Sequence, residues 1–377
     1  MSKLPPELFN FVLNELRSGG DDAKTLFDLR LVSKPIKQIT TPLAFKGVAV
    51  RASVKSAEAV SVLQDSEDES LRDAVKEVVF RGDERVVLRE GNAAEETAAL
   101  VKVFSGLAKF PRLESLQLDL HDQYEEDRAE SGPTSYLRLQ LALFESLTTN
   151  HPPSLTSLAL NNVIAKPDSI YTRDDFKVIF QPLQRLELSI LSEDPDCEGS
   201  YAEQPLVDFW AKSIPSIIRN ATSLTSLTLR STAQWVGAMS FKDIFLPELS
   251  ELVLHKFILE PMMAEYDTVE FILRHKNTLT RLELSSCSIG GGEEGTPMPR
   301  LWHAVFKSFE KELVNLKEFV LLDEEGGEDF DERLMYTVLL AGDGYAIAED
   351  EIGGGEEDLA ALESLREVMN SRNTFDE

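Results

Sequence analysis

Leu224-Thr225-Ser226-Leu227-Thr228-Leu229 is one copy of an apolar pattern, L-x-x-L-x-L, that recurs through most of this chain of 377 residues. The last two apolar positions alternate with other residues, as they do on one face of a β-strand. Successive copies begin between 25 residues (Leu224 to Leu249) and 42 residues (Leu113 to Leu155) apart. A recurrence at roughly 20–50 residues predicts stacked structural repeats. The other copies begin at Val75, Leu113, Leu155, Leu183, Leu249, Leu279 and Leu316.

Helical patterns lie between these copies. Leu137, Leu141 and Phe144 recur at helical spacing, as do Val269, Ile272 and Leu273, and further helices are expected near residues 207–219 and 301–313. A strand and a helix with one apolar face each must stack on neighbours to bury those faces. The expectation is an α/β solenoid with a parallel sheet on one face and helices on the other. The alternative is that these strands belong to an ordinary α/β sheet.

The pattern resembles the leucine-rich-repeat family over residues 75 to about 322. In that family a position for Asn or Cys follows the strand. Cys287 keeps that position here, whereas Val163, Thr232 and Phe257 stand there in other copies. The resemblance therefore implies an irregular solenoid without a ladder of buried asparagines.

The first 45 residues do not follow the repeat pattern. Pro5 and Pro6 suit the first turn of a helix that Gly19-Gly20 would end, and Asp22 and Ser33 can cap a second and a third helix. A unit of about 40 residues buries too little surface to be stable alone. Either the repeats cover it as an N-terminal cap, or a partner protein covers part of it.

Four motifs stand in this segment: Leu4-Pro5-Pro6-Glu7-Leu8, Val12-Leu13-x-x-Leu16, Leu26-x-x-Leu29-Arg30-Leu31-Val32-Ser33-Lys34 and Thr41-Pro42-Leu43-Ala44-Phe45. Together they resemble an F-box of the kind found in fungal proteins. Such a resemblance implies docking on a Skp-type adaptor, and through it on a cullin scaffold, so that the repeats present a protein substrate for ubiquitination. It also implies a strand at 47–51 and a helix at about 55–64. By position, the implied adaptor contacts are Leu4, Pro5, Leu8, Val12, Leu13, Leu26, Leu29, Val32 and Ile36.

The expected function is therefore a non-enzymatic substrate-recognition subunit of a Skp-cullin-F-box ubiquitin ligase. A ligase-independent leucine-rich-repeat scaffold or inhibitor, with residues 4–45 as a helical cap, stays open as the alternative. Side chains that alternate with the buried leucines should line the substrate-binding face of the sheet. These are Arg185, Glu187, Thr228, Arg230, Val253, His255, Arg281 and Glu283.

Composition limits the classes of partner and the cellular compartment that we expect. The 66 Asp and Glu residues exceed the 38 Lys and Arg, and a net charge of −28 would repel nucleic acid and anionic membranes. Only Cys197 and Cys287 are present, so a disulfide framework is not expected. With no apolar signal segment at the start, the chain is expected to be soluble and cytoplasmic and/or nuclear.

No motif of catalytic chemistry occurs. The sequence holds no H-E-x-x-H, C-x-x-C, G-x-S-x-G or Walker A pattern, and its 5 histidines are scattered. Acidic pairs such as Asp174-Asp175 are interpreted as solvated surface. We expect no catalytic residues, no metal site and no cofactor.

The expected domain boundaries follow from these patterns. They are an F-box at 1–46, the repeats at 47–341, and an acidic, Gly-rich hinge with a capping helix at 342–377. Leu359, Leu362 and Leu365 carry the helical spacing of that last segment.

Overall fold

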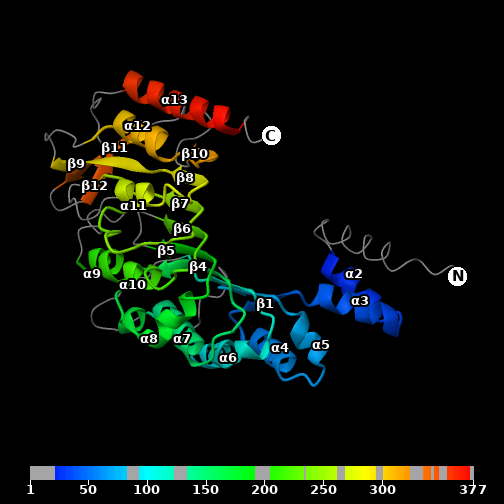
Figure 1. The fold of residues 1–377 in the computed structure, drawn as a ribbon. Helices are drawn as coiled ribbons and strands as arrows, with labels where there is room; N and C mark the ends of the chain where they lie inside the picture. The colour runs from blue at the N-terminus through cyan, green and yellow to red at the C-terminus, as the bar shows by residue number, and fades with distance from the viewer. Residues whose placement is uncertain are drawn as a thin grey trace. The chain divides into compact units, whose positions relative to one another are not determined.

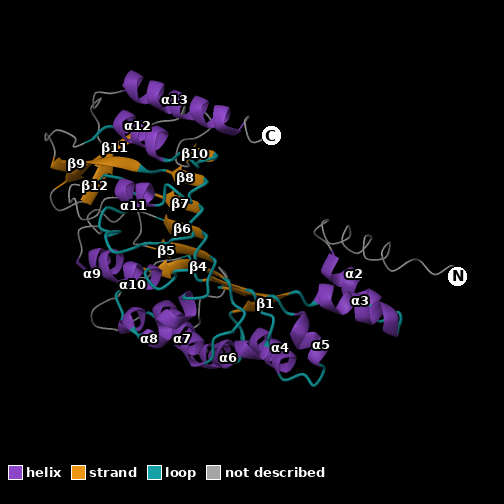
Figure 2. Ribbon diagram, in the orientation of Figure 1, coloured by secondary structure: helices purple, strands orange, loops and turns teal. Residues whose placement is uncertain are grey.

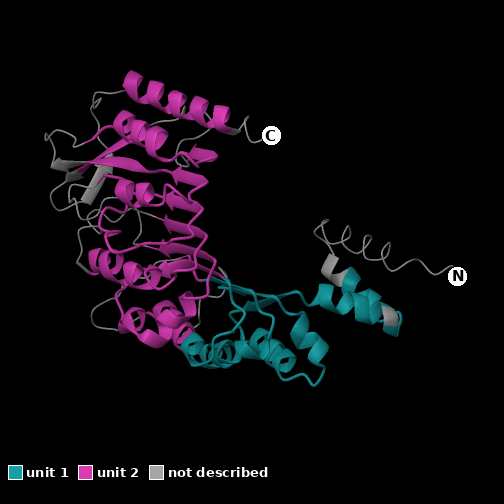
Figure 3. Ribbon diagram, viewed as in Figure 1, with its two compact units in different colours: residues 1–119, 146–156 teal, residues 120–145, 157–377 magenta. Residues whose placement is uncertain are grey.

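The structure is a computed structural model that describes residues 22–82, 93–122, 134–191, 204–232, 235–260, 268–293, 300–322, 334–340, 344–347 and 355–373. It divides into two compact units, which Figure 3 colours separately. Unit 1 consists of residues 1–119 and 146–156, and unit 2 of residues 120–145 and 157–377. The domain boundaries expected from the sequence, at 46/47 and 341/342, stay predictions.

Unit 1 begins with two helices whose starts the sequence predicted, near Asp22 and Ser33. Ser33 caps the second of them, because its hydroxyl accepts the backbone N–H of Ile36 at 3.4 Å. The first predicted helix falls in residues 1–21 and lies outside the described residues. The helices of unit 1 are α2 (Asp22–Leu29), α3 (Lys34–Ala44), α4 (Val54–Gln64), α5 (Glu69–Ala74), α6 (Ala93–Ser105) and the 3-10 helix η1 (Leu107–Lys109).

Three parallel strands follow in chain order in unit 1. They are β1 (Gly47–Arg51), β2 (Glu77–Arg81) and β3 (Ser115–Asp119). Val78 pairs in register with Leu116, and both side chains are fully buried. The apolar positions of the repeated pattern thus form the core of this unit.

Unit 2 contains six more parallel strands, also in chain order. Leu186, Leu227, Leu252 and Leu282 are in register on adjacent strands, and each is at most 2% exposed. The alternation in the sequence predicted this buried face, and the structure confirms it. The strands are β4 (Ser157–Ile164), β5 (Arg185–Leu191), β6 (Ser226–Ser231), β7 (Glu251–His255), β8 (Arg281–Ser285) and β10 (Glu318–Leu322).

The helices of unit 2 lie along one side of these strands (Figures 1 and 2). Helix α7 contributes residues to both units, and helices are present where they were expected, around residues 269–273 and near 207–219 and 301–313. The helices are α7 (Ser135–Thr149), η2 (Ser169–Thr172), α8 (Asp174–Lys177), η3 (Val178–Phe180), α9 (Gln204–Asp208), the π-helix η5 (Phe209–Ser213), α10 (Ile214–Ile218), α11 (Thr268–Arg274), α12 (Trp302–Glu312) and α13 (Gly355–Asn373).

A second sheet in unit 2 was not expected from the sequence. It consists of β9 (Ser288–Glu293), β11 (Met335–Leu340) and β12 (Gly344–Ile347), in the order β12-β11-β9. β11 pairs in parallel with β9 and antiparallel with β12. The predicted solenoid held only parallel strands, so this antiparallel pair is a departure from it.

The fold class predicted from the sequence was wrong as stated. The described chain is an α/β fold with nine parallel strands and a second, three-stranded mixed sheet, not a three-helix F-box followed by a leucine-rich-repeat solenoid. Between β6 and β7, residues 235–250 contain no helix, so the expected unit of one strand and one helix does not recur throughout. The L-x-x-L-x-L pattern reports the local strand, because it reflects burial of alternate residues, and does not specify how strands are connected.

Cys287 is a buried structural residue. Its Sγ donates to the carbonyl oxygen of Leu254 at 3.3 Å, and burial raises the pKa of the thiol to about 12. The chain turns just before it through Ser286, whose φ of 47° lies in the left-handed region, and Lys256 occupies the same place after β7 with a φ of 58°. A thiol with such a pKa is a poor nucleophile.

No helix in the described ranges is long and apolar enough to cross a membrane.

Candidate functional site

The eight residues predicted to line a binding face are brought together by the strands of unit 2. They come in pairs from the neighbouring strands β5, β6, β7 and β8, and Arg230 is also in register with His255. Glu187, Thr228, Val253 and Glu283 form one row across the sheet. Because alternate residues of a strand point to opposite faces, all eight lie on the face opposite the buried leucines. We call this set the polar face: Arg185, Glu187, Thr228, Arg230, Val253, His255, Arg281 and Glu283.

Six of the eight side chains retain exposure, and two do not. Val253 is only 7% exposed and His255 only 8% exposed. His255 is further engaged, since its Nδ1 lies 2.9 Å from the carbonyl oxygen of Ser231. These two residues therefore form the floor of the polar face rather than contact points on it.

Ion pairs organise the exposed charges. Arg281 donates to Glu283 at 2.5 Å and pairs with Glu318 on β10 at 3.2 Å. Burial lowers the pKa of Arg281, but the hydrogen bonds to Glu318 and Glu283 outweigh it, and the pKa is raised overall. Arg230 lies 3.9 Å from Glu187 on the neighbouring strand. The polar face thus presents charges of both signs, held in place by their neighbours.

The sequence-based prediction missed two residues of this surface. Glu251 and Glu318 flank Arg281 in register on β7 and β10, and both are exposed. The same alternation would have found them, because Glu251 precedes Leu252 and Glu318 precedes Phe319 in copies of the repeated pattern.

The residues expected to contact an adaptor do not all form an exposed surface. Val32 is 65% exposed, whereas Leu26 is buried at 3% and Leu29 and Ile36 are half-buried. Leu31, which was not in the expected set, is 86% exposed. Adaptor binding stays a prediction. Leu4, Pro5, Leu8, Val12 and Leu13 lie outside the described residues.

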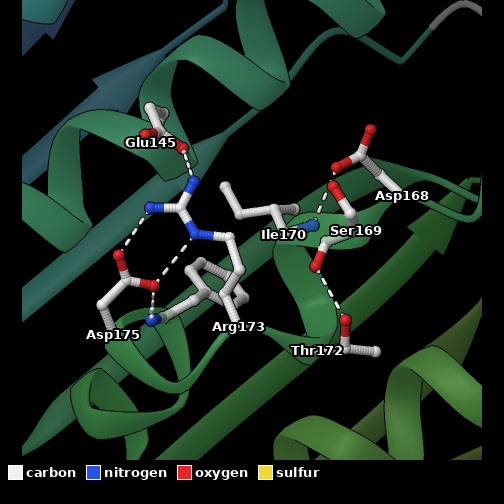
Figure 4. Close-up of polar contacts among 8 residues, drawn as sticks. Glu145, Asp168, Ser169, Ile170, Thr172, Arg173 and Asp175 are labelled. Atoms are coloured by element: carbon white, nitrogen blue, oxygen red, sulfur yellow. Dashed lines mark hydrogen bonds and ion pairs between the residues drawn. The ribbon is translucent and has the colours of Figure 1, made fainter.

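A second polar cluster in unit 2 stabilises the fold. Figure 4 shows Arg173 between Glu145 and Asp175, with an ion pair to each. The hydrogen bond from Arg173 is the largest cause that lowers the pKa of Asp175. In the same view Asp168 caps η2 by accepting the N–H of Ile170 at 2.8 Å. The acidic pair at 174–175 thus lies on the surface and carries a structural ion pair.

The histidines of this unit also have structural contacts. Nδ1 of His275 lies 2.8 Å from the carbonyl oxygen of Phe271, and its Nε2 accepts the N–H of Leu246 at 3.1 Å. Within the described ranges, no three His, Cys, Asp or Glu side chains are grouped in a way that could hold a metal ion.

Comparisons with known proteins supply no family. No family model matches the chain, and no curated protein matches it. Among solved structures it is similar to D-psicose 3-epimerase, crystallised in the presence of D-fructose, at 12% identity and a TM-score of 0.20. The match covers 90% of this chain and 94% of that one. At this TM-score the likeness carries neither a fold nor an activity over to this protein.

The function expected from the sequence is corrected accordingly. A substrate-recognition subunit of a ubiquitin ligase, or a leucine-rich-repeat scaffold, would need support from the comparisons. They supply none, because no family model and no curated protein matches the chain. The assignment rested on short motifs, several of which lie in residues 1–21, and we do not carry it further.

Proposed function

We propose that this protein binds a partner protein on the polar face of unit 2 without catalysing a reaction. The observation that carries the proposal is that eight residues spread over nearly a hundred positions in sequence lie on one face of four neighbouring strands that pair in register. Such a surface is suited to contact another macromolecule, because it is broad and its side chains are placed by a sheet.

The exposure of this face supports the proposal. Parallel sheets usually have both faces covered by helices and read as continuous apolar runs. Here one face is buried, while Arg185 is exposed and Thr228 and Arg281 are half-exposed on the other. Polar alternation on parallel strands leaves a surface that another protein can cover.

The charges on the polar face favour a protein partner over a nucleic acid. Arginines are enriched among the residues that dominate binding energy at protein interfaces. Arg230 and Arg281 are already held by Glu187 and Glu283, so binding costs less side-chain entropy than it would for free side chains. A net charge of −28 opposes binding to a phosphate backbone.

Charge reversal on the polar face tests the proposal. The variant is Arg230→Glu/Arg281→Glu, and the matched control is Lys311→Glu on α12, whose side chain is 81% exposed. Partners captured by the wild-type chain from a lysate would be identified by mass spectrometry, and their affinities measured by calorimetry with purified proteins. We expect the double variant to bind at least tenfold more weakly, because each arginine of a hot spot contributes about 2 kcal/mol or more.

The control variant should bind like the wild type, and circular dichroism should show both variants folded. Unchanged affinity of the double variant for every captured partner would contradict the proposal, since the polar face would then play no part in binding.

A further inference from the structure

A buried carboxylate joins three segments at the C-terminal end of the described chain. Asp358 lies in the first turn of α13 and is fully buried. Its Oδ1 accepts the backbone N–H of His303 at 2.7 Å and lies 3.0 Å from Nδ1 of the same residue. Its Oδ2 accepts the hydroxyl of Tyr336 at 2.5 Å. One carboxylate thus connects α13 with α12 and with β11.

The hydroxyl of Tyr336 has a second role in this cluster. It accepts the backbone N–H of Trp302 at 3.1 Å, at the N-terminus of α12. Burial raises the pKa of Tyr336, and the hydrogen bond to Asp358 raises it further. The phenol therefore stays protonated and remains a donor to the carboxylate.

The other end of α13 is fastened by a positive charge. Arg372 donates from Nη1 to the carbonyl oxygen of Leu313 at 2.9 Å and from Nη2 to that of Glu310 at 2.8 Å. α13 therefore places a negative charge at the N-terminus of α12 and a positive one at its C-terminus. Both complement the dipole of α12 and satisfy backbone groups that have no partner inside the helix.

Between its two ends α13 has a narrow apolar contact. Ala361, Leu362, Leu365 and Met369 are at most 6% exposed, whereas Leu359 is 46% exposed. In Figure 1 α13 lies alongside α12, and α13 is not a member of either sheet. The contacts that hold it come from side chains, so it can leave α12 without breaking a strand pair.

We propose that α13 detaches from α12 as a unit, and that the hydrogen bonds accepted by the Asp358 carboxylate hold it in the closed state. In the closed state the carboxylate has donors from two other segments. In the open state it is hydrated, and Leu362 and Leu365 are exposed, so closure is favoured but depends on each donor. α13 contributes no residue to the polar face, so its detachment does not depend on whether that face binds a protein.

Hydrogen–deuterium exchange of the full chain, followed by mass spectrometry, tests this proposal. The variants are Asp358→Asn, which removes the charge, and Tyr336→Phe, which removes the hydroxyl that donates to Asp358 and accepts the N–H of Trp302. The matched control is Glu356→Gln, which removes an exposed carboxylate two residues before Asp358. In the wild type, peptides of α13 should exchange together and faster than peptides of β6, β7 and β8.

Both variants should speed exchange of α13 by about tenfold or more, as expected for loss of a hydrogen bond to a charged group. Exchange in β6, β7 and β8 should be unchanged, and Glu356→Gln should behave like the wild type. Equal acceleration in those strands, or no acceleration in α13, would overturn the proposal. If Asp358→Asn fails to fold, Tyr336→Phe decides the outcome, because it leaves the carboxylate and most of the packing in place.

Discussion

His275 is a buried residue whose neutral form is built into the fold. It is 2% exposed, and its Nε2 accepts the backbone N–H of Leu246 from the connection between β6 and β7. Burial is the largest cause that lowers the pKa of His275 from its usual value of 6.5, and the charge of Arg274 adds to this. A protonated imidazole could no longer accept that N–H, so protonation is coupled to loss of the contact.

We therefore expect part of the stability to depend on pH through this residue. Because the pKa is lower in the folded state, the unfolded state binds more protons below about pH 6.5. The contribution is fully present above that pH and is lost as the pH falls towards the pKa of the folded state. The free energy of unfolding, measured in urea at pH 7.5 and 5.5, should fall less in His275→Gln than in the wild type. An equal fall in both proteins would show that His275 does not titrate on unfolding.

At the scale of elements, Gly106 allows α4 and α6 of unit 1 to pack closely together. Gln64, at the end of α4, is 2% exposed and donates to the carbonyl oxygen of Val103 in α6 at 2.8 Å. A Cβ on Gly106 would lie 2.8 Å from Oε1 of Gln64. The side chain of Gln64 cannot swing away without losing its hydrogen bond inside the core.

Gly106→Ala should therefore destabilise the protein by about 1–3 kcal/mol, as overpacking of a close contact does. Gly47→Ala is the matched control, because the nearest atom to its Cβ is Oε2 of Glu77 at 3.9 Å. Urea unfolding monitored by circular dichroism gives the free energy of unfolding of each variant. A loss of stability in Gly47→Ala as large as in Gly106→Ala would mean that the clash is not the cause.

The strands also show what the periodicity of a sequence can and cannot predict. The strand pattern located β2 to β8 and β10, because each strand buries alternate side chains on one side. Thr337 of β11 is fully buried and its hydroxyl lies 3.1 Å from that of Ser288. A buried threonine does not read as part of an apolar pattern, so the second sheet was missed. The same limitation led to the wrong fold class.

At the scale of the whole molecule, the excess of negative charge is the feature that most affects stability. The excess of 66 acidic over 38 basic residues leaves a net charge of −28. Surface ion pairs such as Lys76–Glu114, at 2.6 Å with both side chains well exposed, contribute only about 0–1 kcal/mol each. Repulsion among the remaining carboxylates therefore opposes the compact state.

Salt should stabilise this protein at neutral pH. Screening shortens the range of charge interactions from about 30 Å at 0.01 M to about 3 Å at 1 M salt. Because like charges are in excess, we expect the midpoint of thermal unfolding at pH 7 to rise with NaCl, as measured by circular dichroism. A falling midpoint would mean that attractive ion pairs outweigh the repulsion.

The sequence by itself determined the local features of this protein: the positions of eight of the nine parallel strands, the face that each buries, the cap at Ser33 and the composition of the polar face. These follow from periodicity and from residues close in the chain. Tertiary structure decided that Val253 and His255 are covered, that β9, β11 and β12 form a second sheet, and that Asp358 meets His303 across 55 positions. Such contacts depend on packing between distant segments, and no local pattern of residues encodes that packing.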